Sequence, residues 1–393
     1  MSLPARLLLL QVLAPLVAIL FGAVVASGIL LAIDRDPLAV YGQMLRFTLT
    51  RADSLASIFF KATPLILAGL AAALAFRASL WNIGVEGQYY VGAILAAYVG
   101  FAVRGLPGVV HLPLAVLAGA AGGAAWAFLP IALRLRRGAH EVITTIMMNY
   151  IAAALVLYLL EPGLLRDPAQ AGTPRVRTPE VLPGARLPSL RPLLDLVGLQ
   201  IPGYSSLNGM LVVGLLLCVL FALVLRRTTF GFEVRAVAAN PQAAEAAGIP
   251  LGRVLFTMFL LSGAVAGLVG LSDTLGFFGY FDIDFPKGYG FLGISVALLA
   301  RNHPVGVIPA ALLLAFLDRG AQGVQVFAGV PREVITIMQG VIILAIVVAY
   351  ELLTRYLRAL RKREAARAEP ARPPLPAPGE GRRAGEAAGG GTP

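Results

Sequence analysis

Charged side chains are scarce in this sequence. They make up 13% of its 393 residues, whereas a soluble protein of this length carries roughly a quarter. Hydrophobic residues account for 58%, and the mean hydropathy is +0.81. Apolar runs of about 20 residues recur along the chain, and each is long enough to cross a bilayer as a helix. The composition excludes a soluble globular protein and predicts an all-α polytopic membrane protein.

Motifs for metal binding and for several kinds of catalysis are also missing. The single cysteine, Cys218, cannot form an internal disulfide, and no Cys/His spacing suits a metal ion. No G-x-x-x-x-G-K-[ST] motif occurs, so the chain has no P-loop with which to hydrolyse a nucleotide. The histidines are scattered and no Ser/His/Asp set is suggested. We therefore expect no enzyme activity, no metal and no cofactor.

The net charge of +11 reflects arginines at the ends of apolar runs and in the C-terminal 39 residues. Basic residues beside spans act as topology signals that face anionic lipid, so we do not expect nucleic-acid binding. The clusters at Arg134–Arg137, Arg226–Arg227 and Arg355–Arg363 share one side when the N-terminus is cytoplasmic. Both termini are then cytoplasmic, although this arrangement leaves four other arginines outside: Arg35, Arg46, Arg51 and Arg104.

About ten spans are predicted, and together they form a transmembrane domain over residues 1–353. They lie near residues 7–31, 55–76, 85–103, 112–133, 141–160, 207–225, 252–272, 281–300, 304–322 and 333–353. In the eighth of them, the apolar run after Gly288 is too short to span alone, so the helix borrows Phe281–Lys287 or is bent. Residues 161–206 are rich in proline and glycine and predict an external loop of extended chain and turns. Residues 354–393 predict a helical extension followed by a disordered cytoplasmic tail.

Two similar segments indicate an internal repeat. EVITTIMMNYI at Glu141–Ile151 resembles EVITIMQGVII at Glu333–Ile343, and these segments open the fifth and tenth predicted spans. Those two spans run in opposite directions. The pattern predicts an inverted-topology repeat of five plus five spans.

Polar residues inside apolar segments indicate a pathway or interhelical hydrogen bonds, and both alternatives remain open. SLWNIGVEGQYYVGA at Ser79–Ala93 predicts a break before a helix, with Asn82 as a cap and Glu86 in the first turn, where the helix dipole favours an anion. We predict that five residues border a translocation pathway: Asn82, Glu86, Gln88, Asn149 and Gln339. Three aspartates near the external side read instead as solvated loop charges: Asp273, Asp282 and Asp284.

The charged segment RRTTFGFEVRAVAANPQAAEAAG at Arg226–Gly248 lies between two apolar runs and cannot span a bilayer. Pro241 starts a helical turn and Gly248 stops it. The segment predicts a helix on the cytoplasmic membrane surface that docks a partner.

Six motifs in order resemble the permease subunits of bacterial nucleoside ABC importers, within the larger group of ribose- and branched-chain-amino-acid-type permeases. The resemblance covers residues 55–350, and its motifs are WNIGVEGQ, HEVITTIMMNYI, RTPEVLPGARLPSL, RRTTFGFEVRAVAANPQAAEAAGI, GYGFLGISVALLARNHPVGV and GVPREVITIMQGVIIL. It implies an inner-membrane complex of two permeases, an ATP-binding subunit with two ATPase domains usually fused in one chain, and an external lipid-anchored binding protein.

The resemblance further implies that residues 231–248 form the helix that couples the permease to its ATPase. The residues expected to meet the ATPase are Phe232, Glu233, Arg235, Asn240 and Glu245. The alternative is an ion-coupled secondary transporter or channel with inverted repeats, which usually carries membrane-embedded acids or histidines. Here the deep polar residues recognised in the sequence are mostly neutral amides and tyrosine, which favours an uncharged solute such as a purine or pyrimidine nucleoside or a simple sugar.

Overall fold

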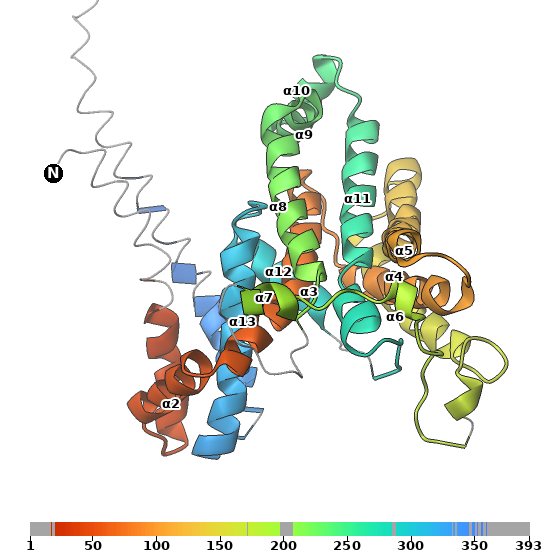
Figure 1. The fold of residues 1–393 in the computed structure, drawn as a ribbon. Helices are drawn as coiled ribbons and strands as arrows, with labels where there is room; N and C mark the ends of the chain where they lie inside the picture. The colour runs from red at the N-terminus through yellow and green to blue at the C-terminus, as the bar shows by residue number, and fades with distance from the viewer. Residues whose placement is uncertain are drawn as a thin grey trace, which may run out of the picture. The chain divides into compact units, whose positions relative to one another are not determined.

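The computed structural model describes residues 20–170, 172–196, 207–284, 288–331 and 336–345, with positions 17, 333, 334, 348, 349, 352, 355, 356 and 359. The chain divides into two compact units, residues 1–24 with 344–393, and Val25–Ile343. The described residues of the first unit are all helical. The second unit contains all the helices labelled in Figure 1, including the segments around Glu86 and residues 226–248 that are described below. Most of the predicted tail after residue 354 lies outside the described residues.

The described part of the chain is helical, without strands (Figure 1). Its α-helices are α2 (Pro37–Leu49), α3 (Ala52–Arg77), α4 (Val85–Ala102), α5 (Gly108–Arg137), α6 (Glu141–Leu159), α7 (Arg191–Leu196), α8 (Met210–Arg227), α9 (Thr229–Ala239), α10 (Pro241–Ala246), α11 (Leu251–Gly267), α12 (Tyr289–Leu299) and α13 (Val307–Ala328). Two 3₁₀ turns, η1 (Pro168–Gln170) and η2 (Pro183–Ala185), and one π-helical segment, η3 (Ser272–Phe277), complete the set.

Six helices among the described residues are long and apolar enough to cross a membrane: Ala52–Arg77, Gly108–Arg137, Glu141–Leu159, Met210–Arg227, Leu251–Phe277 and Val307–Phe327. They match six of the predicted spans. The predicted span 85–103 is present as α4, but this helix is not among the six. Other helices surround α4, so it can carry Glu86, Gln88 and two tyrosines without exposing them to lipid.

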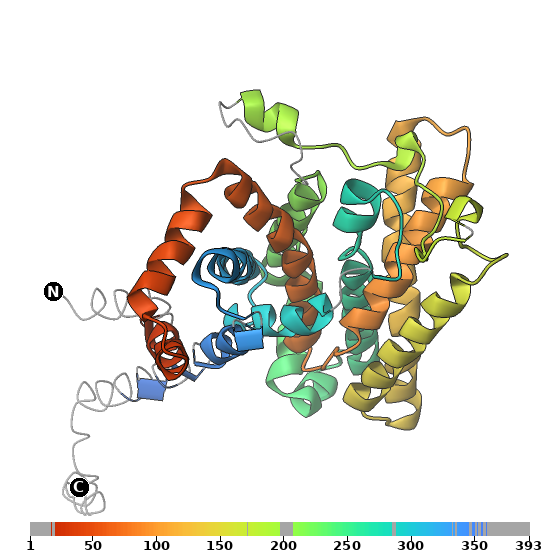
Figure 2. The same cartoon turned by 90° about the horizontal axis from the view of Figure 1, so that it is seen from below.

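Glycines determine how α4, α5 and α11 pack, and Figure 2 shows α11 lying alongside α5. A Cβ atom on Gly267 would lie 2.1 Å from the carbonyl oxygen of Gly119, and one on Gly123 would lie 2.2 Å from that of Gly263. On α4, a Cβ on Gly92 would lie 2.4 Å from the oxygen of Gly267. Only glycine permits these backbones to approach so closely. We call these five residues the glycine seam.

Helix α12 corrects the predicted span 281–300. The helix has 11 residues, ~16 Å of rise, which is about half of the hydrocarbon core. It does not borrow Phe281–Asp284, because these residues form a bridge and a turn, and Gly288 then adopts a left-handed φ of 92° before the helix begins. Helix α2 was missed by the sequence analysis, although Asp36 followed by Pro37 is an N-terminal signal: the Asp36 side chain accepts a hydrogen bond from Leu38 N.

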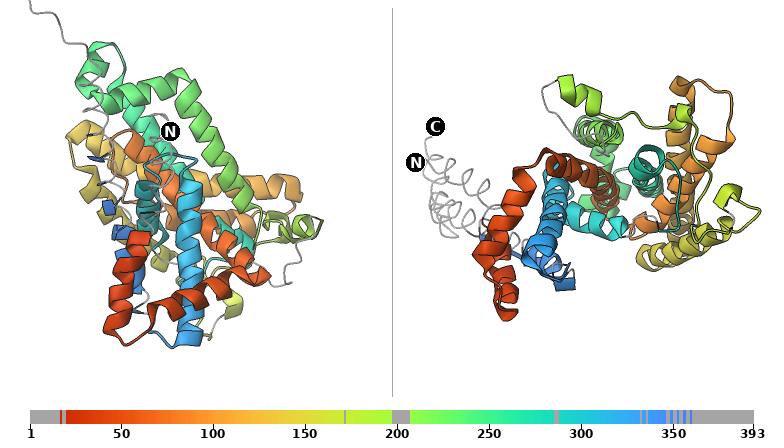
Figure 3. Two further views of the ribbon diagram at one scale, coloured as in Figure 1. Left: turned by 90° about the vertical axis from the view of Figure 1, so that its left-hand side faces the viewer. Right: turned by 60° about the horizontal axis from the view of Figure 1, so that its bottom comes forward.

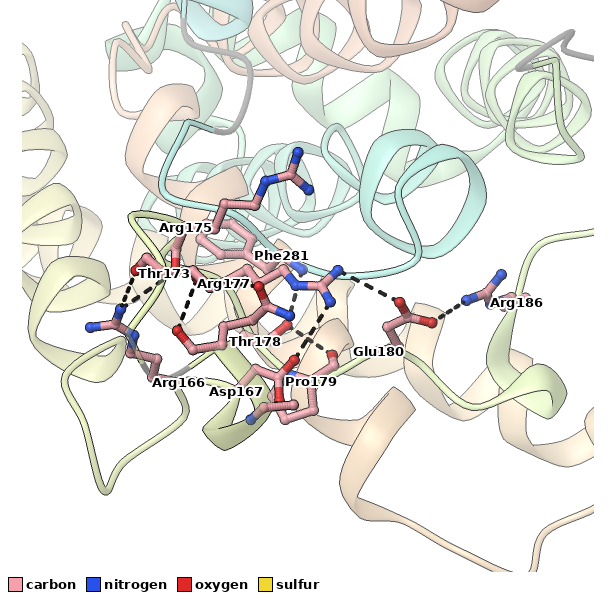
Figure 4. A network of polar contacts seen from close by, with 12 residues as sticks. Arg166, Asp167, Thr173, Arg175, Arg177, Thr178, Pro179, Glu180, Arg186 and Phe281 are labelled. Atoms are coloured by element: carbon pink, nitrogen blue, oxygen red, sulfur yellow. Dashed lines mark hydrogen bonds and ion pairs between the residues drawn. The ribbon is translucent and has the colours of Figure 1, made fainter.

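The segment predicted as extended loop, 161–206, contains η1, η2 and α7 in its described part and is held by other segments. Thr178 and Phe281 exchange hydrogen bonds, and Ile283 N donates to Val176 O. Arg177 forms ion pairs of 3.6 Å with Asp167 and with Glu180, as Figure 4 shows. The Arg177 guanidinium also lies 4.2 Å from the ring centroid of Tyr280. Residues 166–186 are therefore anchored to the connection between η3 and α12.

Candidate functional site

The break between α3 and α4 is organised around the carboxylate of Glu86. Its Oε1 accepts hydrogen bonds from Tyr89 Oη at 2.9 Å, Tyr90 Oη at 3.1 Å and Gly288 N at 2.6 Å. Its Oε2 accepts from Gly290 N at 2.8 Å. The carboxylate is buried and receives donors from two helices that lie about 200 residues apart in the sequence.

Glu86 thus serves the N-terminus of α12 as well as lying in the first turn of α4. Its carboxylate occupies the position of a capping group for α12, where N–H groups lack helical partners and the helix dipole favours an anion. Gly290 makes this contact possible, because a Cβ there would lie 2.5 Å from the backbone nitrogen of Glu86. The sequence analysis placed Glu86 at the dipole of its own helix, and the structure adds the partner helix.

A second set of hydrogen bonds joins the break to α3 and α11. Asn82 Nδ2 donates to Gln88 Oε1 and to Ser262 Oγ, both at 2.9 Å. Gln88 Nε2 donates back to Asn82 Oδ1 at 3.0 Å, and Ser262 Oγ donates to Ala71 O at 2.6 Å. Asn82 Oδ1 also accepts from Gly84 N, which is the residue that caps α4. Asn82 therefore stabilises the turn before the helix rather than capping the helix itself.

Asn149 attaches α6 to the same break. Its Oδ1 accepts from Gly87 N at 2.8 Å, and its Nδ2 donates to Ile83 O at 2.9 Å. Gln339 lies apart from these contacts, on the short apolar helix Thr336–Ala345, and is partly exposed. The structure brings four of the five predicted pathway residues into adjoining networks and satisfies their polar groups with protein partners. That they border a pathway stays a prediction.

The charged segment after α8 folds as two short helices at one end of α8 and α11 (Figure 1). Thr228 caps α9 by accepting from Gly231 N, and Asn240 caps α10 by accepting from Ala243 N, each at 3.1 Å. The predicted start at Pro241 and stop near Gly248, which has a φ of 82°, are confirmed. The single helix predicted over 231–248 is wrong, because the Asn240–Pro241 pair ends one helix and starts the next.

These two helices, which we call the surface helices, bury one face and expose the other. Val234, Val237 and Ala244 are buried. Phe232 is 61% exposed, so its ring is available to a partner. Arg235 hydrogen-bonds the carbonyl oxygen of Leu225 at the end of α8, which fixes α9 to that helix. The other residues predicted to meet an ATPase are exposed or half-buried: Glu233, Asn240 and Glu245.

Asp273 overturns one interpretation of the sequence. It was read as a solvated loop charge, but it lies in the π-helical segment η3 and is 2% exposed. Among the described residues, none donates a hydrogen bond to its Oδ2. The sequence signal that could have found it is its position at the end of a long apolar run rather than in a loop.

Charged pairs between α3 and α13 add to the mostly neutral polar residues that stood out in the sequence. Lys61 pairs with Asp318, and Arg319 pairs with Asp53 at 3.3 Å. Arg319 also donates to Ser54 and Gln322. The sequence analysis missed these residues because nothing in the order of the sequence aligns residue 61 with residue 318.

Comparisons with known proteins show to which family this chain belongs. Residues 54–347 match the family model described as "Branched-chain amino acid transport system / permease component". The guanosine ABC transporter permease protein NupP of Bacillus subtilis is 38% identical over 357 residues, covering 91% of this chain and 98% of the relative. The glucose ABC transporter permease protein TsgB13 of Haloferax volcanii is 38% identical over 344 residues, covering 87% of this chain and 88% of the relative.

The nucleoside ABC transporter permease protein NupB of Lactococcus lactis is 32% identical over 364 residues, covering 91% of this chain and 97% of the relative. The matches thus extend over nearly the whole of each relative and include both the break at Glu86 and the surface helices. With six long apolar helices among its described residues, this multi-pass membrane protein belongs to the family of branched-chain amino acid transport system permease components, as a permease subunit of the ABC type.

Proposed function

We propose that this chain forms the translocation pathway of an ATP-driven importer for a nucleoside or a related small polar solute. One observation carries the proposal: the surface helices connect two long apolar helices and present exposed side chains at one end of them. The relatives support the solute class, since their names include guanosine, nucleosides and glucose. All of these solutes are uncharged and rich in hydroxyl groups.

The surface helices are suited to transmit movement. Arg235 fixes α9 to the carbonyl oxygen of Leu225 in the last turn of α8, and α9 also packs against α11. A force on Phe232 or Glu233 would therefore reach two spans through short, capped helices rather than through a flexible loop. We propose that an ATP-binding subunit, with two ATPase domains fused in one chain, binds this exposed face through Phe232, Glu233, Arg235, Asn240 and Glu245.

The end of the bundle that carries α9 is strongly basic, which supports its cytoplasmic location. Arg226 and Arg235 lie close enough to Arg77 for their charges to repel, and Arg77 donates a 2.8 Å hydrogen bond to Asn302 O. The pKa of His303 is lowered by its partial burial and by the charges of Arg77 and Arg226. Positive residues at span ends favour the cytoplasmic side, and we propose that both termini lie there.

Ten spans remain our proposal for the topology. The six long apolar helices, α4 and the shorter apolar helices Leu20–Ala32, Tyr289–Leu299 and Thr336–Ala345 all overlap the predicted ranges, although α12 by itself covers only about half of the hydrocarbon core. We also propose the inverted repeat of five plus five spans, and the start of α6 at Glu141 agrees with the predicted start of the fifth span. We further propose that the pathway forms with a second homologous permease, beside the break that contains Asn82, Glu86, Gln88 and Asn149 and beside Gln339. An external lipid-anchored binding protein would deliver the solute.

Uptake by the reconstituted complex tests the proposed function. Proteoliposomes that contain the copurified complex and its binding protein should accumulate labelled guanosine, uridine or glucose only when ATP is present on the cytoplasmic side. The alternative, an ion-coupled transporter, requires uptake by this chain alone, driven by an ion gradient. Gradient-driven uptake without ATP would overturn the proposal.

A further inference from the structure

Two charged side chains from helices far apart in the sequence meet well inside α3 and α13, away from the helix ends. Helices α3 and α13 pack side by side (Figure 3). Lys61 lies nine residues after the start of α3, ~14 Å along its axis, and Asp318 lies eleven residues after the start of α13, ~17 Å along its axis. Their ammonium and carboxylate groups form an ion pair.

This pair differs from its neighbour on the same two helices. The side chains of Arg319 and Asp53 are 17% and 15% exposed, and Arg319 has further partners in Ser54 and Gln322. Those of Lys61 and Asp318 are 26% and 49% exposed. The Arg319–Asp53 pair is therefore enclosed by protein, whereas about half of the Asp318 side chain is left uncovered by this chain.

An uncovered charge at this depth restricts what can lie against it. A charged group at the centre of a membrane helix costs about 3 kcal/mol or more when it faces lipid. Such groups usually face a hydrated cavity or pair with one another. Asp318 is paired with Lys61 and still half-exposed. Contact of its exposed surface with water or a polar solute is therefore lower in free energy than contact with hydrocarbon.

The opposite charges of Lys61 and Asp318 limit which solutes can bind beside them. A cation would be repelled by the ammonium of Lys61, and an anion would be repelled by the carboxylate of Asp318. A neutral group that both donates and accepts hydrogen bonds satisfies both charges, since a carboxylate accepts and an ammonium donates. Neighbouring hydroxyl groups on a sugar ring have this property. Guanosine and glucose, the solutes in the names of two relatives, both carry them.

We propose that Lys61 and Asp318 form a binding site in the pathway for adjacent sugar hydroxyls of the solute, with Asp318 accepting and Lys61 donating. The site rests on the proposed function, and it locates specificity for the sugar within the permease. It predicts that the permease distinguishes solutes with paired hydroxyls from analogues that lack them.

Uptake of matched analogues tests the site in the reconstituted complex. The probes are guanosine and 2′,3′-dideoxyguanosine, which lacks both adjacent ribose hydroxyls. A hydrogen bond to a charged group corresponds to a difference of roughly tenfold or more. We expect Asp318→Asn to reduce uptake of the hydroxylated solute by about tenfold and to leave uptake of its deoxy analogue within about twofold of wild type.

The matched control is Ser54→Ala, which perturbs the neighbouring enclosed pair and should change uptake of both members of the probe pair equally. If Asp318→Asn also lowers both members equally, the pair is structural and the site is overturned. If the wild-type complex takes up neither probe, the proposed nucleoside class of solute fails as well. The two failures are therefore distinguishable.

Chemical labelling provides a readout that does not depend on transport. In a Cys218→Ser background, Asp318→Cys should react with a charged, membrane-impermeant thiol reagent, and guanosine or glucose should slow the reaction. Leu216→Cys, at a 63% exposed apolar position on α8, should resist the reagent because it faces lipid. Equal resistance at position 318 would place this residue against lipid or against protein and would overturn the site.

Discussion

The Glu86 carboxylate should be the most sensitive polar group in the break between α3 and α4. Replacing Glu86 with glutamine preserves its size but removes the charge and one acceptor oxygen. An amide oxygen turned toward Tyr89, Tyr90 and Gly288 would leave an NH₂ group facing Gly290 N, whose bond to Glu86 is 2.8 Å long. A buried donor left unpaired costs about 1–3 kcal/mol.

The three remaining hydrogen bonds change from charged to neutral acceptors, which weakens each by about 1 kcal/mol. The total loss of folding free energy for Glu86→Gln is therefore about 4–6 kcal/mol. Glu86→Ala should cost more, since all four donors would lose their acceptor and the buried site would lose packing volume.

Cys218 provides a built-in probe for this measurement. It is the single cysteine of the chain and is fully buried on α8, so its thiol becomes reactive when the helices separate. Heating the purified protein in detergent with a thiol-reactive fluorogenic dye gives a midpoint of unfolding. We expect Glu86→Gln to lower the midpoint by several degrees, whereas Glu245→Gln, on the exposed face of α10, should leave it unchanged. A Glu86→Gln midpoint within about 1 °C of wild type would refute the capping role.

Three further predictions concern transport and topology. Glu233→Ala should leave the permease folded while uptake and stimulation of the ATPase fall, and unchanged stimulation would contradict the coupling role. Asn149→Leu leaves Gly87 N and Ile83 O unpaired, which costs about 1–3 kcal/mol for each group. It should therefore reduce uptake more than Gln339→Leu does. Normal transport by both variants would show that neither Asn149 nor Gln339 borders the pathway. In a cysteine-free background, Asn240→Cys should be labelled from the cytoplasmic side and Glu180→Cys from the external side, and the reverse pattern would overturn the topology.

The long helices could be predicted from the sequence because each is an apolar run, and most of these runs end at arginine or glycine. Helices α5 and α8 end at Arg137 and Arg227, at the basic clusters that the sequence showed. The start of α10 at Pro241 was predictable for a similar local reason. Helix α12 was not, because its N-terminus depends on Glu86, which lies about 200 residues earlier in the sequence.

The polar residues of the break were found from the sequence, but their partners were not. Asn82, Gln88 and Asn149 stand out against apolar neighbours, whereas Ser262 and the carbonyl of Ala71 do not. The charges of Lys61 and Asp318 were passed over for a related reason: a sequence pattern records position along one helix and does not record which helix lies opposite. Pairing across helices is a property of packing, and it required the structure.

The glycine seam has a consequence for how the protein can move. Where backbones touch without intervening side chains, no rotamer can change to relieve a shift, so a displacement of α5 against α11 has to carry both helices or separate them altogether. The seam therefore makes α4, α5 and α11 a rigid block, since α4 contacts it through Gly92. Opening and closing of the pathway must then occur at helix interfaces lined by larger side chains, such as those of α8 and α13. These helices would move relative to the rigid block of α4, α5 and α11.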